Sequence, residues 1–319
     1  MSADPFSDIL KFTKAEMLAT GSFTAGGPWA IRFPAPKSIK FFAVVRGHCW
    51  VRVDGGPEAA RFDAGDVGLL TAERAFVLAS DLELEPLDAM SVFSGSGRST
   101  AMLGDGGDFE HVGGHVRLDP QSGRLLADVL PPWIHIRAAS QEATTFRWLL
   151  ARLVEERSTH QPGGQLAAEQ IAQLLFIQVL RARLKLPELM PAGWLRALGD
   201  PRIAPAMRHM HGDPARSWRL DELAKVCAMS RTTFALQFRT VVGTAPLTYL
   251  GQWRMHLAER ALREETTPVA VIGQSLGYTS ESAFSNAFKR VTGRSPRAHR
   301  FQTDLSRATV VDPDIASLP

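Results

Sequence analysis

The sequence predicts an α+β protein with a small N-terminal β-barrel or sandwich, a helical linking segment and an all-helical C-terminal domain. Three observations lead to this prediction. Short apolar runs broken by Gly and Pro fill the N-terminal part, apolar residues are then spaced three and four apart, and a helix–turn–helix pattern occurs twice near the C-terminus. The chain has 319 residues, of which 45% are hydrophobic and 22% charged, so it is long enough for two globular domains.

Residues 1–137 are expected to form the β domain. The segment IKFFAVVRGHCWVRVDGG, residues 39–56, is rich in β-branched and aromatic residues and ends on Asp54-Gly55-Gly56, a hairpin-type turn signal. A further turn is expected at Gly65-Asp66, between two short apolar runs. Many short segments with frequent Gly and Pro favour a barrel or a sandwich.

Residues 138–199 form a predicted helical linker. The segments TFRWLLARLVEERS, residues 145–158, and LAAEQIAQLLFIQVLRARL, residues 166–184, both have the apolar spacing of helices. The second carries a broad apolar stripe, made by Ile171, Leu174, Leu175, Val179 and Leu180. This stripe either packs against the β domain or pairs with the same helix of a second subunit, and the sequence leaves both alternatives open.

The last hundred residues contain an approximate repeat. LAKVCAMSRTTFALQFRTVVGTAP, residues 223–246, aligns with IGQSLGYTSESAFSNAFKRVTGRSP, residues 272–296. The offset is 50 residues after the turn and 49 before it, so the second copy has one extra turn residue. Each copy has the pattern of a helix, a short turn and a second helix, and the long segment between them predicts a helix that joins the two units.

Local signals fix the second helix of each unit. Ser230 and Ser280 are natural N-caps, Gly243 and Gly293 suit left-handed C-caps, and Gly277 suits the tight turn. The residues expected to face the core are Phe234, Phe238, Val241 and Val242 in the first copy and Phe284, Phe288 and Val291 in the second.

The charge of the chain is distributed unevenly. Residues 200–301 hold 15 Lys and Arg against 8 Asp and Glu, a balance of +7, whereas residues 1–199 hold 20 against 22, a balance of −2. A basic helical third favours an anionic partner such as nucleic acid. Two rigidly joined units would place two recognition helices in neighbouring major-groove segments, roughly 34 Å apart. A plain helical bundle, and with it an interaction or scaffold protein, is the alternative.

The cysteines and the N-terminus limit the class of protein. Cys49 and Cys227 are the two cysteines, which excludes a disulfide framework and a four-thiolate zinc site and favours a reduced cytosolic compartment. The N-terminal MSADPFSDILKFTKAEM does not have the pattern of a signal peptide. No run approaches 18 uncharged apolar residues, so no membrane span is expected.

The two repeats resemble the AraC/XylS family of bacterial transcription regulators over residues 200–301. VAVIGQSLGYTSESAFSNAFKRVTGRSPRAHR, residues 269–300, looks like the signature of that family. GGPWAIRFPAPKSIKFFAVVRGHCWVRVDG, residues 26–55, resembles the cupin-type sensor domain found ahead of such DNA-binding domains, so the β domain is expected to be a cupin-like barrel. The segment near 166–186 looks like the helix pair through which these regulators dimerise.

The resemblance implies a cytoplasmic, homodimeric, sequence-specific DNA-binding transcription regulator. Its partners would be double-stranded promoter or operator DNA, RNA polymerase and a small-molecule effector bound by the β domain. Residues 302–319 would be a C-terminal tail. Because no Ser/His/Asp spacing, phosphate-binding Gly loop or paired-acid motif occurs, no enzymatic activity is predicted.

The resemblance also places the DNA contacts on the second helix of each unit. In the first unit they are Arg231, Thr232, Ala235 and Leu236, with Arg239 placed for a phosphate. In the second they are Glu281, Ser282, Ser285 and Asn286, with Lys289 and Arg290 near the DNA backbone. Ala235 and Leu236 offer only apolar contacts, for instance with a thymine methyl, whereas Asn286 has the groups for a bidentate bond to adenine.

Two hypotheses for the β domain stay open. A small barrel can enclose one ligand, and the residues expected to line such an effector pocket are Trp29, Arg32, Phe33, His48 and Trp50. The alternative is a metal-binding cupin protein or enzyme with an appended helical domain, with His48, His111 and His115 as its imidazoles. A metal site needs three or four converging ligands, so neither a metal nor another cofactor is predicted.

Overall fold

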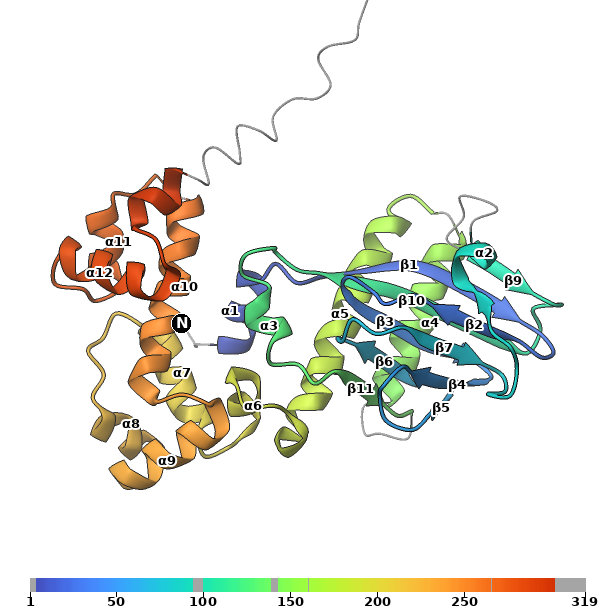
Figure 1. Cartoon of the computed structure of the whole chain (residues 1–319), viewed down its shortest axis with the longest axis horizontal. Coiled ribbons are helices and arrows are strands. Elements are labelled where there is room, and N and C mark those ends of the chain that lie inside the picture. Colours follow the sequence, from blue (N-terminus) through green and yellow to red (C-terminus); the bar gives the residue numbers. More distant parts are fainter. Residues whose placement is uncertain (1–3, 94–99, 139–142, 160, 265, 302–319) are drawn as a thin grey trace, which may run out of the picture. The chain divides into compact units, whose positions relative to one another are not determined.

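The computed structural model describes residues 4–93, 100–138, 143–159, 161–264 and 266–301, and the predicted tail, 302–319, lies outside them (Figure 1). The chain divides into two compact units. Thr13–Pro191 form one, the β unit, and Met1–Phe12 with Ala192–Pro319 form the other, the helical unit. Among the described residues, no helix combines the length and the apolar character needed to cross a membrane.

Two facing sheets form the frame of the β unit (Figure 1). The strands of the six-stranded sheet are, in order across it, β11 (Trp133–Ile136), β6 (Val67–Leu70), β3 (Ile39–Arg46), β10 (Phe109–Arg117), β1 (Glu16–Ala25) and β9 (Thr100–Leu103). Those of the five-stranded sheet are β5 (Ala60–Asp63), β4 (His48–Val53), β7 (Phe76–Ala79), β2 (Ala30–Phe33) and β8 (Leu87–Asp88). The core lies between the sheets, and its fully buried members include Phe23, Ile31, Phe42 and Phe62.

Side chains along the strands alternate between the core and the outer face, as a two-layer fold requires. Along β4, Cys49, Val51 and Val53 are buried in the core while the residues between them face outward. The predicted turns at Gly55 and Gly65 are confirmed, because these residues have φ of 62° and 92°, which glycine adopts without a steric cost.

A helical hairpin packs on the six-stranded sheet. It consists of α4 (Ala143–Thr159) and α5 (Gly164–Leu184), which contact each other and the sheet. The Gln173 side chain of α5 accepts a hydrogen bond from Met17 N–H and donates one to the Ala15 carbonyl, both at 2.9 Å. Within the predicted stripe Leu175, Val179 and Leu180 are fully buried, whereas Leu174 is 39% exposed. Packing on the β unit therefore accounts for most of the stripe.

The described part of the helical unit includes a short N-terminal helix, a helical segment at 296–301 and seven further helices. The seven are α6 (Trp194–Gly199), α7 (Ala204–Gly212), α8 (Leu220–Val226), α9 (Arg231–Val242), α10 (Pro246–Glu264), α11 (Val269–Ser275) and α12 (Glu281–Thr292). The predicted units are α8–α9 and α11–α12, and α10 contacts α9, α11 and α12 (Figure 1). The aromatic pairs Phe234–Phe238 and Phe284–Phe288 are fully buried.

The expectation of strands throughout residues 1–137 is wrong for the first helix, α1 (Pro5–Phe12), which belongs to the helical unit. Phe6, Ile9 and Leu10 are spaced as a helix requires and are buried, and α1 contacts α6 and α7. The Phe12 ring meets that of Trp253 edge to face at 6.0 Å. Shorter helices within the β unit are α2 (Ala89–Phe93), α3 (Arg124–Ala127) and the 3₁₀ turn η1 (Pro187–Leu189).

Candidate nucleic-acid interface and ligand cavities

The helices α9 and α12 are built on the same frame. Each is 12 residues long and begins after a serine N-cap. Ser230 Oγ accepts from Thr233 N–H at 3.2 Å, and Ser280 Oγ accepts from Ala283 N–H at 3.1 Å. The glycines that end the helices have φ of 86° and 78°. The capping predictions are therefore confirmed in both units.

The turns before the two helices differ in strain. Gly277 has φ of 85°, and a Cβ added there would lie 2.0 Å from the carbonyl oxygen of Ala215. Its counterpart in the first unit is Ala228, a non-glycine residue with φ of 52°. Only glycine fits the turn of the second unit without a shift of the backbone, whereas the first unit carries the milder strain of an alanine in the left-handed region.

One core prediction is wrong. Val291 is 46% exposed, although its counterpart Val241 is 2% exposed. In the first unit α6 packs against α9, and Gly193 N–H donates to the Val241 carbonyl at 3.0 Å. α12 packs mainly against α10 and α11, and Val291 at its end stays partly exposed.

The structure brings each predicted set of DNA contacts onto one face. On α9 the side chains of Arg231, Thr232, Leu236 and Arg239 are exposed and that of Ala235 is half-buried. On α12 the exposed ones are Glu281, Ser282, Asn286, Lys289 and Arg290, and Ser285 is half-buried. Both faces point away from the buried phenylalanines, because positions three and four apart fall on one side of a helix.

The polar groups on these faces are largely free. Glu281 is paired with Arg297 at 3.3 Å, and Ser282 Oγ lies 3.1 Å from Ser280 Oγ. The side chains of Asn286, Lys289 and Arg290 form no hydrogen bond or ion pair with the residues that the structure describes. Their donors and acceptors are therefore available to an external partner.

The face of α9 is different in character. Leu236 is 69% exposed and Ala235 beside it has only a methyl group. The neighbouring charges come from Arg231 and Arg239, which are exposed and have no counter-ion among the described residues. This face offers cations and an apolar contact, but no side-chain amide.

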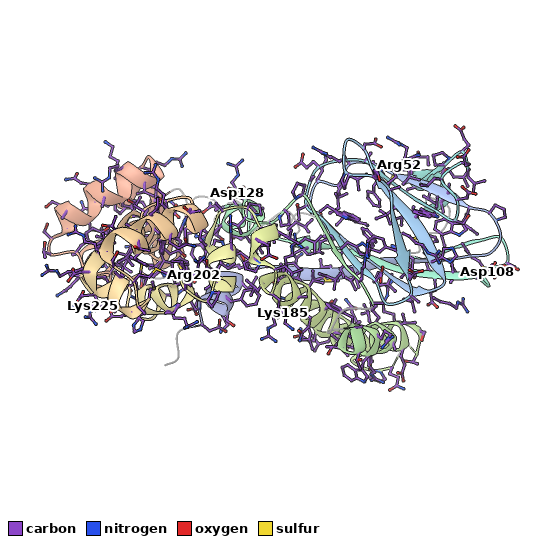
Figure 2. All side chains as sticks on the ribbon, turned by 90° about the horizontal axis from the view of Figure 1, so that it is seen from below. Arg52, Asp108, Asp128, Lys185, Arg202 and Lys225 are labelled. Carbon is purple, nitrogen blue, oxygen red and sulfur yellow. The ribbon has the colours of Figure 1, made fainter. Side chains whose placement is uncertain are left out.

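Two other basic residues of the helical unit, Lys225 and Arg202, differ in whether their side chains have a partner among the described residues (Figure 2). Lys225 on α8 is exposed. Arg202 instead pairs with Asp200 at 3.2 Å, and Asp200 also accepts a hydrogen bond from Gln237 of α9 at 3.3 Å. Burial opposes ionisation of Asp200, but these hydrogen bonds hold its pKa below the ordinary value. The carboxylate therefore anchors the buried side of α9.

The five residues expected to line an effector pocket do not come together. Trp29 is buried in the core, where its ring lies 5.2 Å from Phe23 and 4.6 Å from Phe109. Arg32, His48 and Trp50 lie on the outer face of the five-stranded sheet, and Arg32 pairs there with Asp54. Phe33 is the one that lines a cavity.

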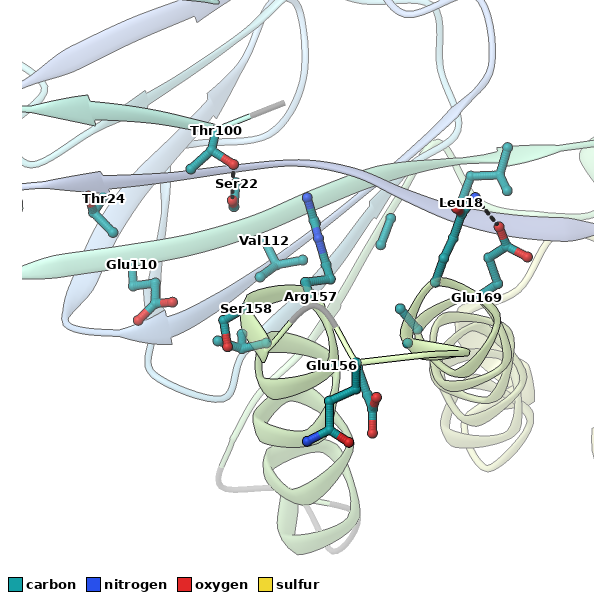
Figure 3. Close-up of a pocket in the computed structure, with 16 residues that line it drawn as sticks. Leu18, Ser22, Thr24, Thr100, Glu110, Val112, Glu156, Arg157, Ser158 and Glu169 are labelled. Atoms are coloured by element: carbon teal, nitrogen blue, oxygen red, sulfur yellow. Dashed lines mark hydrogen bonds between the residues drawn. The ribbon is translucent and has the colours of Figure 1, made fainter. Parts of the chain in front are cut away.

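Several cavities open in the β unit, and one of about 880 Å³, termed the larger cavity, lies between β1, β10 and the α4–α5 hairpin (Figure 3). The polar side chains on its lining include Ser22, Thr24 and Glu110. Arg157 points from α4 toward the sheet and donates to the Gly21 carbonyl at 3.4 Å. Burial lowers the pKa of Arg157.

The smaller cavity, about 380 Å³, lies at one end of the space between the sheets, beside α2. Phe33, Phe76 and Phe93 supply apolar walls, and Lys40 and His111 are its ionisable groups. Sequence reasoning missed Lys40 as a site residue and weighed His111 only as a metal ligand. The sequence offers one indication: Lys40 lies two residues before Phe42 in a predicted strand, so the two side chains are expected on the same, inward-facing side.

No three His, Cys, Asp or Glu side chains within the described ranges come close enough together to hold a metal ion. His48 is exposed, His111 is buried and His115 is half-buried. Burial raises the pKa of the Cys49 thiol, which disfavours the thiolate that a metal needs. The metal-binding alternative therefore has no site among these residues.

Comparison with known proteins assigns both parts of the chain. A cupin family profile matches residues 4–185, and a helix-turn-helix domain profile matches residues 223–302. A putative AraC-like transcription regulator of Streptomyces antibioticus is 42% identical over 298 residues, covering 93% of this chain and 98% of that protein. The HTH-type transcriptional regulator AlkR of Acinetobacter baylyi is 30% identical over 288 residues, covering 87% of this chain and 92% of that protein.

The chain belongs to the AraC family of transcription regulators, with a cupin domain ahead of a helix-turn-helix domain. It is a DNA-binding transcription factor. Among solved structures, the DNA-binding domain of AdpA in complex with a target DNA matches 34% of this chain and 97% of that chain at 30% identity and a TM-score of 0.33. ToxT from Vibrio cholerae matches 92% of this chain and 98% of that chain at 10% identity and a TM-score of 0.35.

Proposed function

We propose that this transcription factor reads a specific duplex sequence with α9 and α12, that α12 supplies most of the base discrimination, and that the β unit regulates it by binding a small-molecule effector. The observation that carries the proposal is the exposed face of α12. Short side chains, Ser282 and Ser285, surround an unpartnered amide, Asn286, and basic residues follow one turn later.

The chemistry of each face suggests its role. The Asn286 carboxamide has one donor group and one acceptor side by side, which match the edge of adenine in the major groove. Serines beside it allow a close approach of the helix to the bases. Lys289 and Arg290 on α12, and Arg239 on α9, would neutralise phosphates, which orients the protein without reading sequence.

The remaining parts of the proposal concern assembly. Residues 200–301, together with α1 and α6, would form the DNA-binding domain and residues 13–137 the sensing domain, with 138–191 as linker and dimerisation segment. Three large apolar side chains of the α4–α5 hairpin support a homodimer through it, because Trp148 and Leu166 are each 62% exposed and Leu174 is 39% exposed. Family membership supports action in the cytoplasm, with RNA polymerase as a further partner and no catalytic reaction.

The salt dependence of binding tests the role of the basic residues. DNA fragments selected by the purified full chain would be titrated at increasing salt concentration. Affinity should fall steeply, because every Lys or Arg that meets a phosphate releases condensed counterions. Arg239→Ala should weaken binding to all sequences alike and reduce the salt slope by about 1.

The matched control is Arg52→Ala, which removes an exposed arginine from β4 of the β unit (Figure 2). It should change neither the affinity nor the slope. A flat salt response of the wild-type chain, or an Arg239→Ala variant that binds as the wild type does, would contradict the proposed interface.

A further inference from the structure

The smaller cavity of the β unit has the size and walls of a small-molecule site. Its volume of about 380 Å³ lies within the range of ligand pockets. The rings of Phe33 and Phe76 stack at 4.9 Å with an interplanar angle of 7°, and Phe93 adds a third aromatic wall at 6.2 Å from Phe33. Such walls favour the apolar body of a ligand.

Lys40 introduces a positive charge into this apolar site. It lies on the inward face of β3, in line with the fully buried Phe42 and Val44. Its Nζ lies 6.0 Å from the centre of the Phe33 ring, and it has no carboxylate partner among the described residues. Burial lowers the pKa of Lys40. A half-buried ammonium without a counter-ion is unfavourable, and an anion in the cavity relieves that cost.

His111 supplies a second, independent sign of a ligand. Its side chain is 5% exposed, and neither ring nitrogen has a hydrogen-bond partner within the described part of the chain. Burial, and then the charge of Lys40, lower its pKa to about 3, so the ring is neutral near pH 7. A neutral imidazole keeps one N–H donor and one acceptor, and buried groups of this kind are normally satisfied.

Neighbouring residues leave room for this ring. Its centre lies 4.8 Å from that of Phe23 and 6.4 Å from that of Phe42. Gly113 follows two positions later on the same strand face, and a Cβ there would lie 2.8 Å from Cε1 of His111. The other ionisable group next to Lys40 is His115, its cross-strand neighbour on β10. Burial, followed by the charges of Lys40 and Arg117, lowers the pKa of His115, and an imidazole, being neutral or cationic, cannot serve as the counter-ion of Lys40.

From this geometry we infer that the smaller cavity binds a small carboxylic acid with an apolar body. Lys40 Nζ donates a charge-assisted hydrogen bond to the carboxylate, His111 N–H donates to its second oxygen, and the apolar body lies against Phe33, Phe76 and Phe93. The inference rests on the sensing role proposed for the β unit and gives that role a site and a ligand class. The larger cavity carries no comparable signal, because no buried polar side chain lining it lacks a partner among the described residues.

Matched pairs of acids and amides test the inference on the full chain. Octanoate and 3-phenylpropanoate would each be titrated by calorimetry beside their primary amides, octanamide and 3-phenylpropanamide. Each acid should bind about 10- to 100-fold more tightly than its amide, as expected for a hydrogen bond to a charged group in a desolvated site. Equal binding of acid and amide, or no binding of either acid, would overturn the inference.

Variants at the two polar residues locate the site. Lys40→Met keeps an unbranched side chain of similar length and should abolish the preference for the acid. His111→Phe keeps an aromatic ring beside Phe23 and Phe42 and should weaken acid binding by about 2- to 10-fold. A Lys40→Met variant that still prefers the acid would contradict the inferred role of Lys40 in binding the carboxylate.

Two matched controls and a stability measurement separate binding from folding. Lys37→Met and His48→Phe change the same residue types at exposed positions of the same unit and should leave acid binding unchanged. Without ligand, the melting temperature of Lys40→Met should equal or exceed that of the wild type, because an unpaired, half-buried charge has been removed. A lower melting temperature would contradict the absence of a counter-ion for Lys40.

Duplex binding measured on the same samples keeps the two proposals apart. Wild type and Lys40→Met should bind the selected DNA equally without ligand, and octanoate or 3-phenylpropanoate should change the affinity of the wild type alone. Acid binding without any change in DNA affinity would uphold the site and overturn its sensing role. Failure of the wild type to bind a specific duplex would overturn the proposed function and leave the result at the cavity standing.

Discussion

The two helix-turn-helix units share a buried frame but present different faces. Phe234 and Phe238 on α9 correspond to Phe284 and Phe288 on α12, and all four are fully buried. The outward positions have diverged, so that α9 shows Ala235 and Leu236 where α12 shows Ser285 and Asn286. The buried repeat fixes the position of each helix, and the exposed residues decide what each helix can recognise.

A second difference lies in how the frames are covered. The first unit is supported by α6, which packs against α9, whereas α12 ends with a partly exposed Val291. The first unit is therefore held in place by an additional helix, and its exposed face carries arginines and an apolar side chain but no side-chain amide. The second is less covered and carries the groups suited to base recognition.

The buried frame is tested by replacing one of its phenylalanines in each unit with alanine. Phe234→Ala and Phe284→Ala should each lower the free energy of unfolding by about 3–5 kcal/mol, because each removes a fully buried ring and leaves a cavity. Urea unfolding of the full chain, followed by circular dichroism, measures the loss. Val291→Ala is the control and should cost less than about 1 kcal/mol, since its side chain is partly exposed. A small loss for either phenylalanine would show that the frames are not equivalent.

The turns should respond unequally to an exchange of residue type. Gly277→Ala should lower the free energy of unfolding by about 1–3 kcal/mol, because alanine is strained at φ of 85° and its Cβ meets the Ala215 carbonyl. Ala228→Gly should change it by less than about 1 kcal/mol, since relief of strain at φ of 52° is offset by the greater chain entropy of glycine. Thermal unfolding measures both. Tolerance of alanine at position 277 would contradict the close approach seen there.

The caps should behave alike in the two units. Ser230→Ala and Ser280→Ala each remove an acceptor for a free helix N–H, and each should cost about 1 kcal/mol in the free energy of unfolding. Thr232→Ala, which changes the exposed second residue of α9, serves as the control and should cost less. Unequal losses at the two serines would argue that the repeated frame differs at its helix starts.

Local chemistry explains what the sequence predicts well. Ser230 and Ser280 as caps, Gly243 and Gly293 as helix ends and Gly277 in the turn all depend on residues close in the chain. Each residue type carries its conformational preference wherever it occurs, and the repeat shows each signal twice. The two helix-turn-helix units were therefore predictable.

The features that could not be predicted from the sequence depend on contacts between residues far apart in the chain. Lys40 looks like an ordinary polar position of a strand, and only the closing of the two sheets removes it from water. From the sequence, His111 is a candidate metal ligand, but in the structure it lies against aromatic rings. The membership of α1 in the helical unit, and the exposure of Val291, depend on which elements meet far along the chain. No local pattern encodes these contacts.

If α12 discriminates bases while α9 chiefly anchors the protein on DNA, the two helices should differ when binding is measured base by base. Wild type, Asn286→Ala and Leu236→Ala would each be titrated against the selected duplex and its single-base variants. We expect Asn286→Ala to lose about 1–3 kcal/mol of discrimination at one position of the site, and Leu236→Ala to lose less than about 1 kcal/mol. Equal losses, or a larger loss for Leu236→Ala, would contradict the account.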